Sequence, residues 1–178
     1  MPSTTHQNDA RKAEAIDIRM PDRSDAVAVW RLVGACPPLD LNSSYCYLLL
    51  CSHLRETCAV AEAPGLGVVG FLSALTPAAH PESLFVWQVA VAAAARRRGV
   101  AGRLLRFVLT HPATAEVRFI EATVGPKNQA SRALFQRLAA ERGAPLHIHP
   151  GFDPGCFPGA HEGEDWLRVG PLDGSRGA

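Results

Sequence analysis

The chain has 178 residues, 47% of them hydrophobic, and a formal net charge of +1 at pH 7. This length and apolar content predict a single domain with one hydrophobic core. The balanced charge excludes an acidic tail and a disordered chain. It also argues against nucleic acid as a partner, because a nucleic-acid binder would carry a basic stripe and this chain has one tight arginine cluster only.

Hydrophobic periodicity and turn signals divide the chain into strands and helices. In the first half we expect a strand over residues 15–20, a helix from Asp22 or Ser24 to about Ala35, a second helix capped by Asn42-Ser43 that carries Leu54, and strands over residues 57–63 and 68–76. In the second half we expect a strand over residues 83–92, a helix containing Leu104–Leu109, a strand over 117–124, a helix over 128–142 and a strand over 166–169. Strands mixed with helices in this order predict an α/β or α+β layered domain.

The strand expected over residues 83–92 is apolar on both faces. One face carries Phe85, Trp87, Val89 and Val91, and the other carries Val86 and Ala90. Such two-sided apolarity predicts a central strand that is covered on both faces.

Polar segments flank the expected domain. Residues 1–14 should be a disordered segment and residues 173–178 a short tail, with one domain over residues 15–172 between them. The N-terminal residues lack the apolar stretch of a signal peptide, and no apolar run approaches the roughly 18 residues that cross a bilayer. We therefore expect a cytoplasmic protein without a membrane partner.

The cysteine count is odd and no two cysteines have the CxxC spacing. The five are Cys36, Cys46, Cys51, Cys58 and Cys156. Buried, reduced thiols are the expected state. A zinc site would need cysteines and histidines clustered at short spacings, and His147 and His149 have no paired cysteines nearby, so we expect no metal.

The most informative segment is Arg96–Gly102, which lies between the expected central strand and the next helix. Free amides and the positive dipole end at a helix start form an anion site, and glycine lets a pyrophosphate approach the backbone. Arginines add charge that can pair with phosphates, although a solvated basic helix start would look similar. A Walker loop would end in Gly-Lys-Ser/Thr, and a Rossmann fingerprint would have glycine near Arg103, so neither motif fits.

Three segments in this part of the chain resemble the GNAT superfamily of acetyltransferases. Arg96-x-x-Gly99-x-Ala101 resembles the Q/R-x-x-G-x-G/A loop, Trp87–Val91 resembles the fourth strand, and Asn128-x-x-Ser131-x-x-Leu134-Phe135 resembles the second cofactor-contacting motif. The resemblance implies a mixed, mostly antiparallel sheet that is splayed at the acyl-CoA site, with helices on both faces. It also implies acetyl-CoA as co-substrate, held by Val89, Ala90, Val91, Arg96, Arg97, Arg98, Gly99, Val100, Ala101, Gly102, Asn128, Ser131 and Phe135.

Phe135 departs from the superfamily pattern. Many members have a tyrosine at this position that protonates the departing thiolate, and phenylalanine cannot do so. The general-acid role is therefore open, and a thiol is acidic enough that the thiolate of coenzyme A can leave without one.

A closer resemblance spans about residues 15–172. Its most distinctive part is the segment Cys36–Leu50, which resembles the first substrate loop of the L-2,4-diaminobutyrate acetyltransferases of ectoine synthesis. It continues through residues 84–91, 120–123, 128–131, 144–146, 161–164 and 168–171. The resemblance implies acetyl transfer to the distal N4 amine of L-2,4-diaminobutyrate in a homodimeric enzyme.

The acidic residues fit such a substrate, because its ammonium groups need carboxylates and its carboxylate needs donors. Glu121 lies in an apolar strand, where an acid is usually paired or functional, and it is the leading candidate for the general base, directly or through water. Trp87 is a core residue by default, but its indole N–H can reach a ligand, and we count it with Glu121 as catalytic and substrate-binding. Asp40 and Glu164 are expected to anchor ammonium groups, although Asp40 could equally cap or terminate a turn.

Four further residues complete the expected substrate site: Asn42, Tyr45, Gln88 and His161. The first three could equally be structural. His161-x-x-Glu164 is either a solvated turn or a closing flap, and the resemblance favours the flap. Two alternatives stay open: an acetyltransferase for another small amine, such as a polyamine or amino acid, and a non-catalytic acyl-CoA-binding module.

Overall fold

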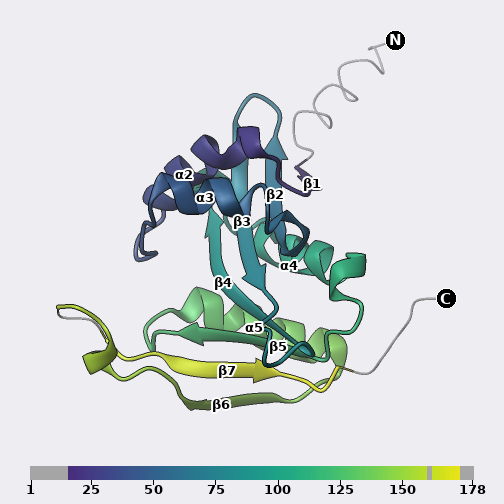
Figure 1. Ribbon diagram of the computed structural model, residues 1–178, viewed down its shortest axis with the longest axis vertical. Coiled ribbons are helices and arrows are strands. Elements are labelled where there is room, and N and C mark those ends of the chain that lie inside the picture. The colour runs from purple at the N-terminus through teal and green to yellow at the C-terminus, as the bar shows by residue number, and fades with distance from the viewer. Residues whose placement is uncertain (1–15, 160–161, 173–178) are drawn as a thin grey trace, which may run out of the picture. The chain divides into compact units, whose positions relative to one another are not determined.

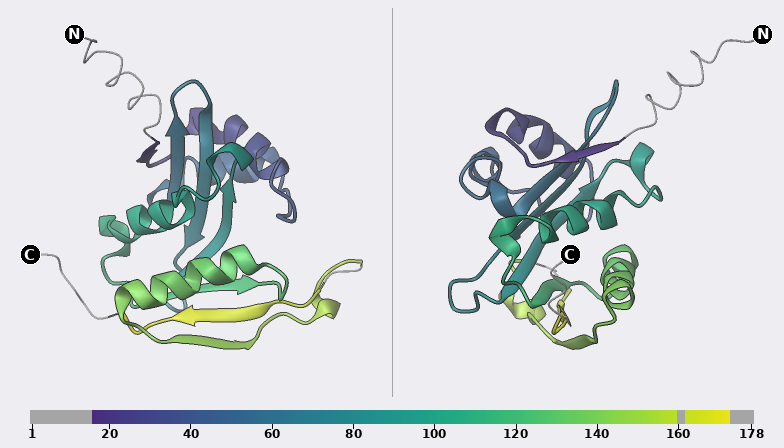
Figure 2. Two further views of the ribbon diagram at one scale, coloured as in Figure 1. Left: turned by 180° about the vertical axis from the view of Figure 1, so that it is seen from behind. Right: turned by 90° about the vertical axis from the view of Figure 1, so that its right-hand side faces the viewer.

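The computed structural model describes residues 16–159 and 162–172, which form two compact units (Figure 1, Figure 2). Unit 1 comprises the described residues up to Ser73 together with Gln88–His111, and unit 2 comprises Ala74–Trp87 together with the described residues from Pro112 on. The segments expected to be disordered, residues 1–14 and 173–178, lie outside the described residues, and the single domain over residues 15–172 stays a prediction.

The described strands form a seven-stranded mixed sheet in the order β1-β2-β3-β4-β5-β7-β6. Their bounds are β1 Asp17–Arg19, β2 Cys58–Ala63, β3 Gly67–Leu75, β4 Ser83–Val91, β5 Phe119–Val124, β6 Leu146–Pro150 and β7 Asp165–Val169. The pairs β1–β2, β2–β3, β5–β7 and β6–β7 are antiparallel, and β4–β5 is parallel. A mixed, mostly antiparallel sheet in an α/β layered fold is therefore confirmed.

Four α-helices and five short 3₁₀ helices lie between these strands in the described part of the chain. The α-helices are α2 Ala26–Gly34, α3 Ser44–Leu50, α4 Val100–Leu109 and α5 Gln129–Arg142. The 3₁₀ helices cover Arg23–Asp25, Arg55–Thr57, Ala93–Ala95, Pro112–Thr114 and Pro154–Cys156. None of the helices within the described ranges is long and apolar enough to cross a membrane.

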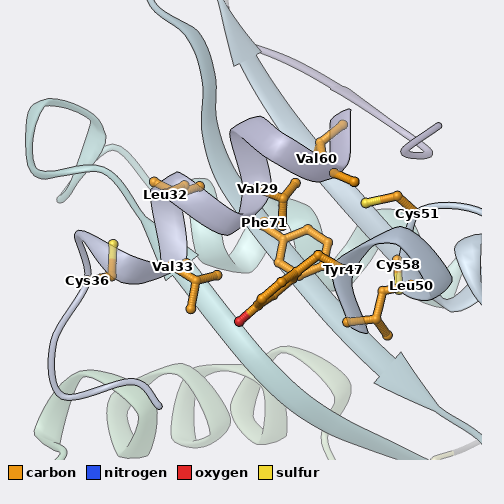
Figure 3. Packing of buried hydrophobic residues seen from close by; sticks show 12 residues of the cluster. Val29, Leu32, Val33, Cys36, Tyr47, Leu50, Cys51, Cys58, Val60 and Phe71 are labelled. Carbon is orange, nitrogen blue, oxygen red and sulfur yellow. The ribbon is translucent and has the colours of Figure 1, made fainter. Parts of the chain in front are cut away.

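Helices cover both faces of the sheet in unit 1. The first face packs on α2 and α3 through Val29, Val33, Tyr47, Leu50, Cys58, Val60 and Phe71 (Figure 3). On the opposite face, a Cβ built at Gly70 of β3 would lie 2.8 Å from Val100 and 3.2 Å from Leu104 of α4. A glycine is therefore needed at this position because α4 packs directly against the backbone of β3.

Side-chain caps mark the start of two helical segments in unit 1. Asp22 Oδ1 accepts a hydrogen bond from the Ser24 N–H at 2.7 Å, and Asp25 Oδ2 accepts one from the Asp22 N–H at 2.8 Å. These bonds belong to a capping box at the 3₁₀ helix Arg23–Asp25, which leads into α2. Ser43 accepts from the Cys46 N–H at 3.3 Å and caps α3. Of the two alternatives at the first helix, Asp22 is the capping residue, but it caps the 3₁₀ helix that leads into α2, and the N-cap of α2 itself, Asp25, makes no side-chain cap bond. The Ser43 cap is confirmed, but α3 ends at Leu50 rather than at Leu54.

In unit 2, the start of β4 pairs with β5 over three residues only. The register runs from Ser83 opposite Phe119 to Phe85 opposite Glu121, and β5 then continues to Val124 against β7. The strand β6 was not predicted, because His147, His149 and Pro150 give it a polar, proline-ended sequence. It lies at the edge of the sheet, where proline and exposed polar residues are tolerated.

The expectation for β4 is half right. The strand is central in the sheet, and Val86, Gln88 and Ala90 are buried on one face. Trp87 on the other face is 42% exposed, so this face is not fully covered by the described residues. An exposed indole in a central strand is a candidate ligand contact rather than a core residue.

Candidate active site

The segment Arg96–Gly102 in unit 1 turns sharply into α4. Arg96 is extended, with φ −66° and ψ 158°, whereas Arg97 and Gly99 have φ values of 61° and 72°. Gly99 is the residue that precedes the first turn of α4, and a Cβ at this position would meet nothing within 4 Å. The backbone therefore needs glycine for its left-handed conformation, while the space beside it stays open.

Backbone amides are available at this turn. The first hydrogen bond of α4 runs from the Arg103 N–H to the Gly99 carbonyl oxygen, so the amides of Val100, Ala101 and Gly102 have no acceptor within the helix. Arg97 and Arg98 are exposed beside them. Three outward amides at the positive end of a ten-residue helix, with cationic side chains alongside, fit a diphosphate group.

Contacts on either side hold the turn in place. Arg96 Nε donates to the Val91 carbonyl oxygen at 3.1 Å, and Arg103 Nη2 donates to the Ile16 carbonyl oxygen at 2.6 Å. The same carbonyl of Val91 accepts from Cys36 Sγ at 3.5 Å. The end of β4 and the turn are thus tied together within unit 1, although the carbonyl of Val91 is already occupied. Contact of Val89, Ala90 and Val91 with the cofactor stays a prediction.

The predicted substrate loop of unit 1 is anchored to β4. Gln88 Nε2 donates to the Asp40 carbonyl oxygen at 2.7 Å, and Gln88 Oε1 accepts from the Tyr47 hydroxyl at 3.1 Å. The same hydroxyl accepts from the Asn42 N–H at 3.3 Å. The structure therefore brings Asp40, Asn42 and Gln88 together: Gln88 binds Asp40 directly, and Tyr47 joins Gln88 to Asn42. Tyr47 was expected only as part of the substrate-loop motif, because a tyrosine one turn after a cap gives no sign of this role.

The side chains that the loop presents are exposed. Asp40 is exposed and Asn42 half-exposed, and neither side chain has a hydrogen bond or ion pair to any described residue. Tyr45, in the first turn of α3, is 67% exposed. These three groups are free to contact a ligand, whereas the amide of Gln88 already has a partner at each end.

Glu121 is the buried acid of unit 2, with 5% exposure. Its Oε1 lies 3.2 Å from Arg168 Nη1 and accepts from the Ser83 hydroxyl at 3.4 Å. Arg168 faces Glu121 across the β5–β7 pair and stacks on Phe119, with 3.8 Å from its Cζ to the ring centroid. Both contacts use one oxygen, and Oε2 has no hydrogen bond or ion pair to a described residue. The ion pair with Arg168 was not predicted, because strand register sets it and no local pattern shows it.

Glu164 lies where β6 and β7 approach each other outside their regular pairing. Its N–H donates to the Phe152 carbonyl oxygen at 2.8 Å, and its own carbonyl accepts from the Gly151 N–H at 3.0 Å. A Cβ at Gly151 would lie 2.5 Å from that carbonyl oxygen, so the close approach requires glycine. Glu164 is half-buried, and His161, its expected partner in a flap, lies outside the described residues.

The second cofactor motif forms the start of α5. Asn128 Oδ1 accepts from the Ser131 N–H at 3.1 Å and caps the helix, which gives these two residues a structural role. Phe135 is buried in the same helix, with 2% exposure, and presents almost no surface to a ligand. Contact of all three with the cofactor stays a prediction.

All five cysteines are free thiols. Cys36, Cys51 and Cys58 are buried as expected, but Cys156 is exposed, because it lies in a Pro-Gly-Cys turn between β6 and β7. Burial raises the pKa of Cys46, and it raises the pKa of Cys51 to about 12. Neither thiol is therefore a thiolate nucleophile at neutral pH. Across residues 16–159 and 162–172, no group of three or more His, Cys, Asp or Glu side chains could hold a metal ion.

Comparisons with known proteins identify the family. Residues 26–140 match the Acetyltransferase (GNAT) family. The chain is 50% identical over 156 residues to the L-2,4-diaminobutyric acid acetyltransferase of Bordetella parapertussis, covering 87% of this chain and 84% of the relative. It is 42% identical over 171 residues to the enzyme of the same name from Halomonas elongata, covering 96% and 89%.

Solved structures extend the comparison. The diaminobutyrate acetyltransferase EctA from Paenibacillus lautus, in complex with its substrate L-2,4-diaminobutyric acid and coenzyme A, superimposes with a TM-score of 0.87 at 42% identity, covering 92% of this chain and 99% of that one. Ard1 from Thermoplasma volcanium shares the fold, with a TM-score of 0.68 at 18% identity over 87% of this chain and 97% of that one. The chain belongs to the GNAT acetyltransferases and, among them, to the L-2,4-diaminobutyric acid acetyltransferase family.

Proposed function

We propose that the chain transfers the acetyl group of acetyl-CoA to the distal N4 amine of L-2,4-diaminobutyrate, giving N4-acetyl-2,4-diaminobutyrate for ectoine synthesis. The observation that carries the proposal is the close match to a relative solved with that substrate and coenzyme A. The turn at Gly99 supports acetyl-CoA as the donor, because backbone amides without an acceptor within the helix lie there beside exposed arginine side chains, and both can bind a diphosphate.

The reaction is a direct transfer. The neutral N4 amine attacks the thioester carbonyl carbon, the C–N bond forms, the C–S bond breaks, and coenzyme A leaves as a thiolate. The ammonium group must lose two protons to become the amide: a base removes one before the attack, and the second leaves the attacking nitrogen as the C–S bond breaks, to the departing thiolate or to water. Glu121 is the proposed base, since its Oε2 has no hydrogen bond or ion pair to a described residue, and the exposed Trp87 is the proposed residue that orients the substrate. No acyl-cysteine forms, in line with the raised pKa of Cys46 and Cys51.

Selectivity for one of two amines follows from charge. Asp40 is the proposed contact of the α-ammonium, with Asn42 and Tyr45 as neighbouring polar contacts, because these side chains are exposed on one anchored loop. Glu164 is a second proposed ammonium contact. An ammonium held by a carboxylate keeps its proton and is not nucleophilic, so only the distal amine reacts. The proposal also includes a homodimer, which the family resemblance implies, and the cytoplasmic location expected from the sequence.

A substrate panel with purified enzyme and acetyl-CoA tests the proposed specificity. We expect L-2,4-diaminobutyrate to be the best substrate. Ornithine and lysine should be poorer by roughly tenfold or more in kcat/KM for each added methylene, because the amine is displaced from the thioester. Faster turnover of spermidine than of diaminobutyrate would indicate another amine acetyltransferase. Tight coenzyme A binding without turnover of any amine would indicate a binding module.

A further inference from the structure

Tyr47 is the largest polar side chain in the core of unit 1. It is fully buried in α3 and packs edge-on against Phe71, with 6.3 Å between the ring centroids. Figure 3 shows its hydroxyl oxygen at the margin of the apolar cluster, pointing away from Leu50 and Cys51. A buried hydroxyl needs partners, and this one uses both its functions: it donates to Gln88 Oε1 and accepts from the Asn42 N–H.

Gln88 completes the network from the side of β4. Its side chain is 4% exposed, its Oε1 accepts from Tyr47 at 3.1 Å, and its Nε2 donates to the Asp40 carbonyl oxygen at 2.7 Å. Each end of the amide is therefore hydrogen-bonded to a group within the protein. Each end of the amide could form one more hydrogen bond, but the side chain is almost wholly buried, so it offers little surface for a direct contact with substrate.

Both bonds to the loop are made to its backbone. The four residues Asp40–Ser43 have no regular secondary structure, and they form the last part of the connection 35–43 between α2 and α3, with Ser43 as the cap of α3. Gln88 donates to the carbonyl oxygen of Asp40, and the Tyr47 hydroxyl accepts from the amide of Asn42. The side chains of Asp40 and Asn42 have no hydrogen bond or ion pair to any described residue. The buried side chains of Tyr47 and Gln88 thus set the position of the backbone that carries the Asp40 and Asn42 side chains.

We infer that Tyr47 and Gln88 are positioning residues that fix the substrate loop and, through it, the Asp40 carboxylate that selects the amine. The inference rests on the proposed function, in which Asp40 contacts the α-ammonium. It gives Gln88 a role through the loop in place of direct substrate contact. Since a displacement of about 1 Å can cost roughly 100-fold in rate, a hydrogen-bonded tether under the loop is a determinant of specificity.

Tyr47→Phe and Gln88→Met remove the hydrogen bonds and keep the shape of the side chains. We expect each variant to raise the KM for diaminobutyrate by roughly tenfold, and to reduce the preference for diaminobutyrate over ornithine, because a loose loop no longer places the α-ammonium. The Kd for acetyl-CoA, measured by calorimetry, should stay within about twofold, which also shows that the variant is folded. Val60→Ala, in the same core but remote from the loop contacts, is the control for lost stability: it should lower the melting temperature and leave the substrate preference unchanged.

A double-mutant cycle with Asp40→Ala separates positioning from general damage. If Tyr47 acts through Asp40, the rise in KM caused by Tyr47→Phe should largely vanish in the Asp40→Ala background. Additive effects would contradict the inference, as would a substrate preference that moves equally in Val60→Ala. An Asp40→Ala variant with unchanged KM would instead overturn the proposed substrate contact, and the tether with it. A rise in KM for Asp40→Ala alone, with Tyr47→Phe and Gln88→Met unaffected, would overturn this inference and leave the proposed function standing.

Discussion

Gly99→Glu should abolish acetyl-CoA binding in a folded protein. Any residue at this position must adopt a φ of +72°. The carboxylate of the glutamate would occupy the open space at the start of α4 where a diphosphate fits. Like charges placed side by side cost several kcal/mol, and each 1.4 kcal/mol is a factor of ten in affinity. We therefore expect the Kd for coenzyme A to rise by roughly 100-fold or more in calorimetry.

Gly65→Glu is the matched control. Gly65 has a φ of +74°, and a Cβ there also meets nothing within 4 Å, so the substitution adds the same charge under the same backbone strain in the turn between β2 and β3. This variant should lose similar stability and bind coenzyme A normally. Equal affinity for coenzyme A in both variants would show that the turn at Gly99 is not the phosphate site.

Glu121→Gln should lower kcat while leaving acetyl-CoA binding intact. The amide keeps the shape of the carboxylate and can still accept from Ser83, but it cannot take a proton from the amine. General bases contribute about 100-fold to 10,000-fold, so we expect a fall in kcat of roughly 100-fold or more. Steady-state kinetics with diaminobutyrate would measure this fall in kcat at pH values from about 6 to 10, the range in which an amine becomes neutral.

Asp165→Asn controls for the loss of an ion pair. Asp165 at the start of β7 pairs with Arg132 of α5, as Glu121 pairs with Arg168, and both carboxylates belong to unit 2. The control should reduce stability with little change in kcat. A Glu121→Gln enzyme that keeps nearly full kcat would assign Glu121 a structural role in the β5–β7 pair, and the base would have to be sought elsewhere.

Local sequence patterns predicted most of the elements, because each carried its own signal. Asp22 or Ser24 marked the helical segment that begins with the 3₁₀ turn and continues as α2, Ser43 marked the start of α3, and the apolar periodicity of Leu104, Leu105 and Val108 marked α4. The strand β6 had no such signal, since it is polar and pairs only at the edge of the sheet. The partial exposure of Trp87 was equally hidden, because a sequence shows that a face is apolar but not whether the chain itself covers it.

The site residues divide in the same way, into those with a local sequence signal and those whose contacts join distant segments. Gly99 and the arginines around it were identified because a phosphate loop is contiguous in sequence. The partners of Glu121 and of the substrate loop come from distant segments: Arg168 lies opposite Glu121 across two strands, and Gln88 lies 48 residues from Asp40. Such pairs are set by strand register and helix packing, so the residues could be named as candidates but their contacts could not be predicted.

The most direct test of the central claim is NMR of the product formed by purified enzyme from acetyl-CoA and L-2,4-diaminobutyrate. The acetyl group should lie on the distal nitrogen, seen as a shift of the protons on the carbon that carries N4, with the signal of the α-proton nearly unchanged. This result is expected because carboxylates such as that of Asp40 hold the α-ammonium in its protonated form. Acetylation at the α-nitrogen, or no product from diaminobutyrate while another amine reacts, would contradict the account.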